Sequence, residues 1–391
     1  MFYQVFLNGT PIIQVFFIIT GFLLGYKTRQ QSEKITLSLK MIPKLIFLRW
    51  IRLVPVYAFV LAIISTWHRI AWTGPLWHLA VVEEAEHCRQ KFWQNLLFIN
   101  NYFDNTQCMP QTWYVSADTQ LYCLGLILCV VLKTDASRKV VISFLMVAGV
   151  VIQGIVTYVM DLDGALLVYP DSIINFFIND PTFNNMYKRG HTNLSSFIIG
   201  LGMGFLVYHL IKNNFNVQKY KKYLWLYKYL IPSFVALSLL SSVFFRDAPR
   251  YPIYVRIAYV LLIKPMFTII LALFLLGLIL RFDELYCGIM ESKYWTITGR
   301  LSYSTYLVHA ILIRSCLGSH ETLLSSYFIH LISHCVSMVV GSFLLAIPVW
   351  LLIEAPCSQL VKLIFTGKKI PMGRKRLTYV KLKRQMTIRK H

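Results

Sequence analysis

Charge is scarce in this chain, and acidic residues are its scarcest part. Only 14% of the 391 residues are charged, and 17 Asp and Glu stand against 39 Lys and Arg. A soluble protein of this length would expose far more charge, so the composition excludes an ordinary water-soluble fold. The sequence also lacks zinc-ligand spacing, a P-loop and the glycine pattern of a dinucleotide-binding fold. We therefore predict no metal site and no covalently bound cofactor.

Long apolar runs take the place of charge. Hydrophobic residues make up 57% of the chain, and the mean hydropathy is +0.56. Crossing a bilayer takes about 20 mostly apolar residues in a helix, whose backbone satisfies its own hydrogen bonds. The sequence therefore predicts an all-α, polytopic transmembrane helix bundle of about nine spans, forming one domain over residues 1–361. The candidate spans are 5–26, 50–67, 113–132, 140–160, 191–211, 224–245, 257–280, 298–317 and 327–353.

The basic residues alternate between connections. One set of alternate connections holds 29 of the 39 Lys and Arg, and the other set holds eight. The first set is 27–52, 133–139, 212–228, 281–300 and the tail 362–391, and the second is 67–112, 161–190, 246–256 and 317–325. Cytoplasmic loops are rich in Lys and Arg. We therefore predict an integral protein of an endomembrane or the plasma membrane, with an exoplasmic N-terminus and a cytosolic C-terminus.

The basic tail over residues 362–391 contains no acidic residue. A segment of this kind is attracted to anionic lipid at the cytoplasmic surface, so membrane lipids are its expected partner, and a specific lipid or protein contact is the alternative. Nucleic acid is not expected as a partner, because the basic residues follow helix ends and do not form a basic domain of their own.

The longest connection, residues 67–112, is predicted to be exoplasmic. Its many aromatic residues favour the membrane interface, so we expect it to fold back over the helix ends. Cys88 and Cys108 both lie in it, 20 positions apart. Because exoplasmic compartments are oxidising, we predict a disulfide between them.

Two arginines stand at the predicted cytoplasmic mouth of the second span. Arg49 and Arg52 are three positions apart and share one helical face. A planar guanidinium binds phosphate through two parallel hydrogen bonds. The pair is therefore either an ordinary positive-inside anchor or a clamp for the phosphates of a nucleotide-bearing donor.

A polar stripe opens the third span, at its predicted exoplasmic start. Tyr114, Asp118 and Tyr122 follow one another at intervals of four residues, and Gln120 adds polarity nearby. A carboxylate within an apolar span is costly and by default indicates function. The alternative is an acid in the first helical turn, which the helix dipole stabilises.

The eighth span carries a second polar stripe, formed by Ser302, Thr305, Tyr306 and His309. Hydroxyls of this kind often join helices inside membranes, whereas a neutral imidazole can also act as a base or a ligand. Lys264, before Pro265, is expected to interrupt the seventh span, and Glu354 is expected to end the ninth. Together these groups predict a polar cavity inside the bundle, although either Lys264 or Glu354 could serve a structural role.

Taken in order, these motifs resemble the acyltransferase 3 family, and within it the nose-resistant-to-fluoxetine group. The resemblance covers nearly the whole chain. It rests on Gln14-Val15-Phe16-Phe17-Ile18-Ile19-Thr20-Gly21, on Arg49-x-x-Arg52 followed by Leu-x-Pro, on Cys88 to Cys108 with Trp93, Asn95, Asn100 and Asn101, on Thr112-Trp113-Tyr114-x-x-x-Asp118-x-Gln120, on Leu301 to His309 and on Glu354-x-Pro356.

The resemblance implies transfer of an acyl group from acyl-CoA, as co-substrate on the cytosolic side, to a hydroxyl-type acceptor. Arg49 and Arg52 would hold the CoA phosphates, and Asp118 and His309 are the catalytic candidates. The family's earlier helix with its histidine has no counterpart, since the first histidine here is His68. The chain would then be either an incomplete sequence or a relative without transferase activity.

Two further positions depart from the family pattern: Gln14 stands where an Asp is usual, and Asn193 where an Arg is usual. Other function classes therefore stay open. A polar cavity in a helical bundle also suits a transporter of lipids or small molecules. A non-catalytic membrane scaffold is the third class, and it predicts that the polar residues can be replaced without effect.

Overall fold

The computed structural model describes residues 10–35, 37–104, 107–167, 177–241, 250–321 and 327–366. All regular secondary structure in these ranges is helical, which confirms the predicted all-α class. The α-helices are α2 (Thr10–Ser32), α3 (Ile42–Ser65), α4 (Glu83–Leu96), α5 (Trp113–Val131), α6 (Asp135–Val159), α8 (Leu194–Lys212), α9 (Leu224–Lys228), α10 (Leu230–Ser241), α11 (Ile253–Ala258), α12 (Lys264–Ile279), α13 (Glu284–Met290), α14 (Lys293–Ser319), α15 (Phe328–Val349) and α16 (Ala355–Thr366).

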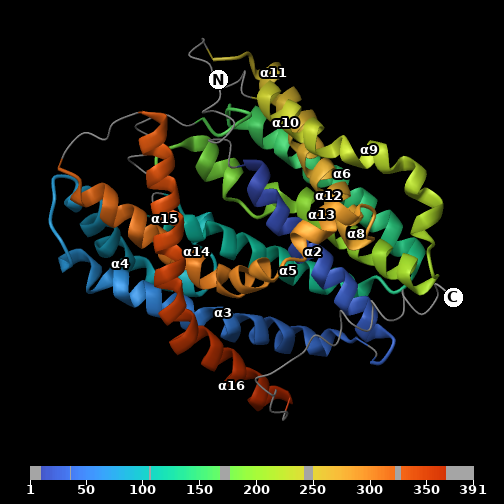
Figure 1. Ribbon diagram of the computed structural model, residues 1–391, viewed down its shortest axis with the longest axis horizontal. Helices are drawn as coiled ribbons and strands as arrows, with labels where there is room; N and C mark the ends of the chain where they lie inside the picture. The colour runs from blue at the N-terminus through green and yellow to red at the C-terminus, as the bar shows by residue number, and fades with distance from the viewer. Residues whose placement is uncertain are drawn as a thin grey trace.

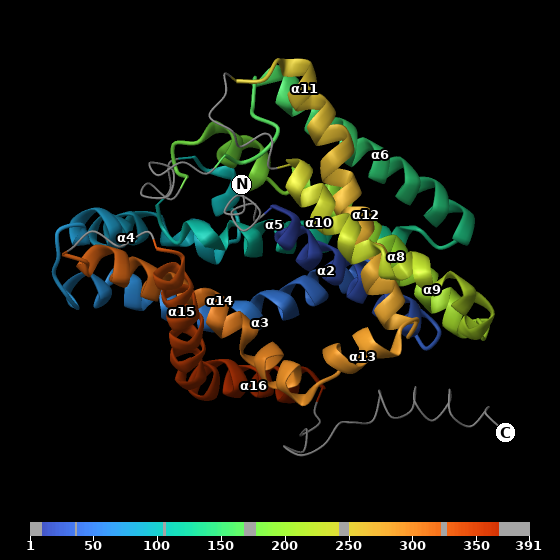
Figure 2. The same cartoon turned by 45° about the horizontal axis from the view of Figure 1, so that its top comes forward.

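The helices form two groups that meet at α2 and α5 (Figures 1 and 2). One group contains α3, α4, α14, α15 and α16, and the other contains α6, α8 and α10 to α12. Each group has its own apolar core. Val115 of α5 packs into the core around α3, whereas Ala117 and Leu121 of the same helix pack into the core around α8. Helix α5 therefore lies between the two cores, and its polar stripe lies at their junction.

Seven helical segments of the described chain are long and apolar enough to cross a membrane, so the polypeptide is an integral membrane protein. They are Leu39–Ile70, Pro110–Val131, Asp135–Val159, His191–Lys212, Val217–Ser241, Ile253–Ile279 and Ile332–Phe365. The expected count of about nine is not confirmed. The spans expected at 5–26 and 298–317 correspond to α2 and α14, which are helical over 23 and 27 residues. Lys27 and Arg29 in α2, and the polar stripe in α14, lower the hydropathy of these two helices.

Wide π-helical turns occur at two of the expected helix interruptions. The turn Tyr259–Ile263 joins α11 to α12 immediately before Lys264 and Pro265. A second turn, Trp350–Glu354, joins α15 to α16. Because a π-turn re-routes the hydrogen bonds that a proline would block, both helices continue. The ninth span therefore does not end at Glu354 but runs on to Thr366, across the predicted boundary at residue 361. The basic tail beyond it lies outside the described residues.

Helices α2 and α8 pack backbone to backbone through glycines. Gly21 and Gly25 of α2 face Gly200 and Gly204 of α8, and both pairs have the small-xxx-small spacing of close membrane helix contacts. A Cβ atom at Gly200 would lie 2.2 Å from the carbonyl oxygen of Ile18, and one at Gly21 would lie 2.3 Å from that of Phe197. Side chains at these positions would push the two helices apart.

Replacing Gly200 with alanine is expected to destabilise the protein by about 1–3 kcal/mol, the usual cost of overpacking a tight core. Gly299→Ala provides the matched control, because nothing lies within 4 Å of a Cβ atom there. Thermal unfolding in detergent should show a lower midpoint for Gly200→Ala only. Equal midpoints for the two variants would show that α2 and α8 are not packed in this way.

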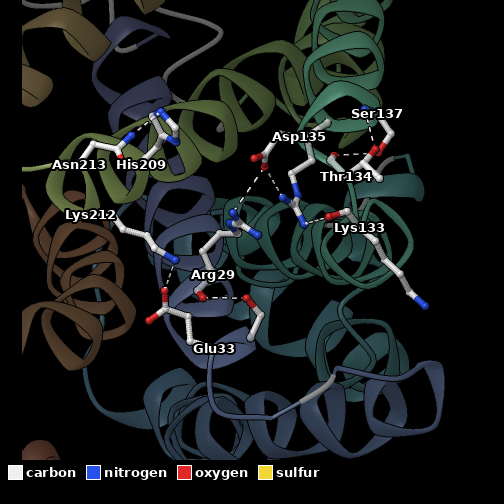
Figure 3. A network of polar contacts seen from close by, with 11 residues as sticks. Arg29, Glu33, Lys133, Thr134, Asp135, Ser137, His209, Lys212 and Asn213 are labelled. Atoms are coloured by element: carbon white, nitrogen blue, oxygen red, sulfur yellow. Dashed lines mark hydrogen bonds and ion pairs between the residues drawn. The ribbon is translucent and has the colours of Figure 1, made fainter.

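The two predicted sets of connections separate in space. At one end of the bundle, Arg29 pairs with Asp135 at 3.4 Å and Lys212 pairs with Glu33 at 2.8 Å (Figure 3). These contacts join three connections of the basic set. Ion pairs of the other set include Arg250 with Asp161 at 2.6 Å and Arg189 with Asp104 at 2.9 Å. Segregation of this kind agrees with the alternation read from the sequence.

The connection 67–112 folds into the bundle. Helix α4 packs along α3, and the indole of Trp50 donates to the carbonyl of Leu96 at 3.0 Å. Cys88 and Cys108 form the predicted disulfide, and both lie inside the core around α3. The segment after α4 therefore runs beside α3 and carries the start of α5 into the interior.

Candidate active site

An ion pair between Arg49 and Asp118 lies where the two helix groups meet. Arg49 stands seven residues into α3 and Asp118 five residues into α5. A terminal guanidinium nitrogen of Arg49 contacts Oδ2 of Asp118. The guanidinium also lies 4.2 Å from the ring centre of Tyr122, within range of a cation–π interaction. The carboxylate is thereby held in one orientation at the junction.

The sequence alone predicts that these two residues lie on opposite sides of the membrane. Asp118 was expected near the exoplasmic boundary and Arg49 at the cytoplasmic mouth. The structure brings them into contact, because the segment after α4 buries the first turns of α5 beside the middle of α3. Asp118 is only 6% exposed, so it is an interior acid and does not cap an exposed helix end.

Three buried polar atoms around this pair have no hydrogen-bond partner among the described residues. They are Oδ1 of Asp118, Nε of Arg49 and Nε2 of Gln111. A buried polar group without a partner is costly. The ion pair therefore leaves one acceptor and one donor available to a bound molecule or water, and Gln111 supplies a second donor.

Aromatic rings surround the pair. The ring of Tyr114 lies 5.0 Å from that of Phe17 on α2 and 6.2 Å from that of Tyr306 on α14. The hydroxyl of Tyr306 donates to the backbone carbonyl of Gln111. Two of the predicted polar residues, Tyr114 and Tyr306, thus line the same site as Arg49 and Asp118.

A polar network fixes the opposite face of α5. The side-chain amides of Gln120 and Asn101 exchange hydrogen bonds of 2.8 and 3.1 Å, and Gln120 also donates to the carbonyl of Phe98 at 2.9 Å. Ser116 donates to Asn100, whose amide donates to Thr112 at 3.1 Å. Gln120 therefore positions α5 and does not reach the ion pair. The supporting role of Asn100 and Asn101 was missed from the sequence, although both belong to its quoted motifs.

The second polar stripe does not act as one face. Ser302 is exposed and donates to the carbonyl of Gly299 at 3.0 Å, and Thr305 donates to that of Leu301 at 2.9 Å. Hydroxyls satisfied by their own helix need no partner elsewhere. His309 is half-buried, with Nδ1 2.6 Å from the carbonyl oxygen of Tyr306. Of this stripe, only Tyr306 belongs to the site.

Arg52 and Glu354 lie outside the Arg49–Asp118 contact. Arg52 is exposed, one helical turn along α3 from Arg49. Glu354 is half-buried and accepts a hydrogen bond of 2.5 Å from Ser304. The two arginines thus have different surroundings, one inside the site and one at its margin.

Lys264 lies in the other helix group. It is 8% exposed, and the nearby Thr268 hydroxyl lies 3.3 Å from that of Ser196 on α8. No polar contact joins Lys264 to the Arg49–Asp118 pair within the part of the chain that the structure describes. Lys264 therefore stands apart from the direct polar contacts of the Arg49–Asp118 pair.

The two positions that depart from the family pattern touch each other. The amide of Gln14 on α2 donates to Oδ1 of Asn193 at 3.0 Å, and both residues are at most 2% exposed. Ser196 donates to the carbonyl oxygen of the same glutamine. A neutral amide pair therefore occupies a buried position between α2 and the start of α8.

Comparison with known proteins agrees with the motifs. The profile of a protein family described as an acyltransferase domain matches residues 1–347. The Caenorhabditis elegans protein named nose resistant to fluoxetine protein 6 is 22% identical over 391 residues. This match covers 95% of the present chain and 47% of the worm protein, so the chain spans about half the length of this relative. No solved structure matches the chain.

Proposed function

Because the chain belongs to the acyltransferase 3 family, we propose that it transfers an acyl group from acyl-CoA to a hydroxyl-type acceptor at the Arg49–Asp118 pair. One observation carries this proposal. A buried carboxylate contacts an arginine through Oδ2, and the hydroxyls of Thr20 and Tyr114 lie close to the same carboxylate, while Oδ1 makes no well-aligned hydrogen bond to a described residue. This is the arrangement that a general base requires.

The proposed step moves one proton and exchanges one bond. Oδ1 of Asp118 takes the proton from the acceptor hydroxyl, whose oxygen then attacks the thioester carbonyl. The carbonyl oxygen gains negative charge, and Nε of Arg49 donates to it. The C–O bond forms, the C–S bond breaks, and the departing CoA sulfur takes the proton back from Asp118. Tyr114 and Tyr306 line the space for the acceptor and the first carbons of the acyl chain.

The two arginines divide the role that the sequence analysis gave to both. The charge of Arg49 is matched by Asp118, so this residue serves the reacting atoms. Arg52 is exposed one turn away, and its guanidinium can hold the CoA phosphates. We further propose that the basic set of connections faces the cytosol, where acyl-CoA is present.

His309 is the weaker candidate for the base. Its Nδ1 atom faces a backbone carbonyl, and no described carboxylate orients the ring. The carboxylate of Asp118, by contrast, is in contact with Arg49 and keeps one oxygen without a hydrogen bond to a described residue. These contacts favour Asp118.

Transport of a lipid or small molecule is the second candidate function. It is favoured by Lys264, an ionisable residue that is 8% exposed inside a predicted span and has no ion pair among the described residues. Intramembrane charges of this kind often mark a transport pathway. A non-catalytic scaffold makes no use of either group.

The experiment uses the chain in nanodiscs of total membrane lipid with radiolabelled palmitoyl-CoA. Free CoA and a labelled ester should form together, at a rate lowered in Arg49→Ala and unchanged in Ser302→Ala. Saturable uptake of label into proteoliposomes, with palmitoyl-CoA intact, would replace the transferase by the transporter. Absence of both transfer and uptake would leave the non-catalytic scaffold as the remaining function.

A further inference from the structure

We propose that Cys316, His320 and His334 bind one Zn²⁺ ion where the end of α14 meets α15. The sulfur of the cysteine and one ring nitrogen of each histidine all lie within 4.8 Å of one another. The three residues are half-buried. This cluster is separate from the Arg49–Asp118 site, and neither the family resemblance nor the proposed function makes use of it.

The spacing of the three residues suits metal binding. Cys316 lies in the last turn of α14, and His320, four residues later, is the residue that caps the end of this helix. His334 comes from the facing helix α15. Thiolate and imidazole are the ligands that Zn²⁺ prefers, with Zn–S near 2.3 Å and Zn–N near 2.0–2.1 Å. Tetrahedral binding at these lengths puts the ligand atoms about 3.4–3.6 Å apart. Side-chain rotations that move the ligand atoms by about 1 Å would therefore complete the site.

One ring nitrogen in the cluster already lacks a partner among the described residues. Nε2 of His320 is buried and makes no hydrogen bond to any described residue. Its ring lies 5.8 Å from that of His334 at an interplanar angle of 79°. A metal ion held by this imidazole, the second imidazole and the thiol would give the buried ring a polar partner, with the fourth position open to water.

The end of α14 is held firmly enough to present these ligands. Arg314, two residues before the cysteine, donates to the carbonyl of Ala80 at 2.7 Å and pairs with Glu84 at 3.1 Å. Ser315 lies 2.8 Å from Nε2 of His68. Zinc binding therefore needs only local movement of the three side chains. The thiol releases its proton, and the two neutral imidazoles donate lone pairs to the ion. The ion would fasten α15 to the helix that carries Tyr306.

The test is zinc binding by the purified full chain in detergent. After dialysis against a chelator, titration with zinc chloride should give one ion per chain by atomic emission. Cys316→Ser and His334→Asn should each lower the affinity by more than the 10–100-fold that loss of an outer supporting group costs. Cys335→Ser is the matched control, because Cys335 adjoins His334 in sequence but is exposed and outside the cluster.

A second readout needs no variant. Zn²⁺ should protect Cys316 of the native chain from alkylation while Cys335 reacts as before, and Co²⁺ should produce a thiolate charge-transfer band. Equal alkylation of Cys316 with and without zinc would overturn the proposal. Equal zinc content in Cys316→Ser and Cys335→Ser would also overturn it, and neither result would affect the acyl-transfer proposal.

Discussion

Replacing Asp118 with asparagine is expected to lower acyl transfer by about 10²–10⁴-fold, the usual contribution of a positioned general base. Asparagine keeps the shape of the side chain but removes its negative charge and its capacity to accept a proton. Arg49 still lies over the ring of Tyr122, and its side chain is 22% exposed, so its charge is not left wholly without contacts. We therefore expect kcat to fall while the binding of acyl-CoA changes little.

The matched control for this change is Asp135→Asn. Asp135 pairs with Arg29 and Arg138 at the end of the bundle, with its side chain 66% exposed, and its replacement should leave transfer unchanged. Asp118→Glu should restore part of the rate, because it returns a carboxylate at a shifted position. Transfer within threefold of the native rate in Asp118→Asn, together with its loss in His309→Ala, would assign the base to His309.

Replacing Arg314 with methionine is expected to destabilise the protein by about 3–5 kcal/mol, because it leaves a buried carboxylate without its partner. Arg314 and Glu84 have side chains only 2% and 1% exposed, and they lie 3.1 Å apart. Burial raises the pKa of Glu84, whereas the Arg314 charge and the N–H of Met109 oppose that rise. Without the arginine, the glutamate must take up a proton or remain an unpaired charge in the core.

The double variant Glu84→Gln/Arg314→Met separates the pair from simple loss of packing. It should recover most of the lost stability, because it buries no charge. Arg250→Met is the exposed control. Arg250 pairs with Asp161 where both side chains are about half-exposed, and such a pair contributes about 0–1 kcal/mol. The stabilities of all three variants are compared by their denaturation midpoints. A double variant that is no more stable than Arg314→Met would contradict this explanation.

Local patterns were enough to predict the helical membrane class, the Cys88–Cys108 disulfide and the stripe that holds Tyr114 and Asp118. The class depends on composition, the stripe depends on neighbours within two helical turns, and the disulfide follows from two cysteines in one connection on the oxidising side. The Arg49–Asp118 contact could not be predicted in this way. It depends on the path of the segment after α4, which enters the core beside α3, and no local spacing specifies that path.

Longer-range pairings show the same limit. Gln14 and Asn193 each depart from the family pattern, but only the fold brings Nε2 of Gln14 within 3.0 Å of Oδ1 of Asn193. In the cluster of Cys316, His320 and His334, the first two residues are four positions apart, which is a common spacing in helices. The third residue lies on another helix. A metal site at this place therefore cannot be predicted from the sequence. The charge of a residue also does not reveal its partner. Arg49 contacts Asp118, whereas Arg52, one helical turn away, is exposed.

The decisive measurement is photocapture of an acyl-CoA analogue with its reactive group beside the thioester, followed by mapping of the labelled peptides. The account predicts label on Tyr114, Tyr122 or Tyr306, with capture strongly reduced in the Arg49→Ala/Arg52→Ala double variant and retained in Ser302→Ala. Label confined to the α12 region around Lys264, or capture unchanged in the double variant, would contradict it.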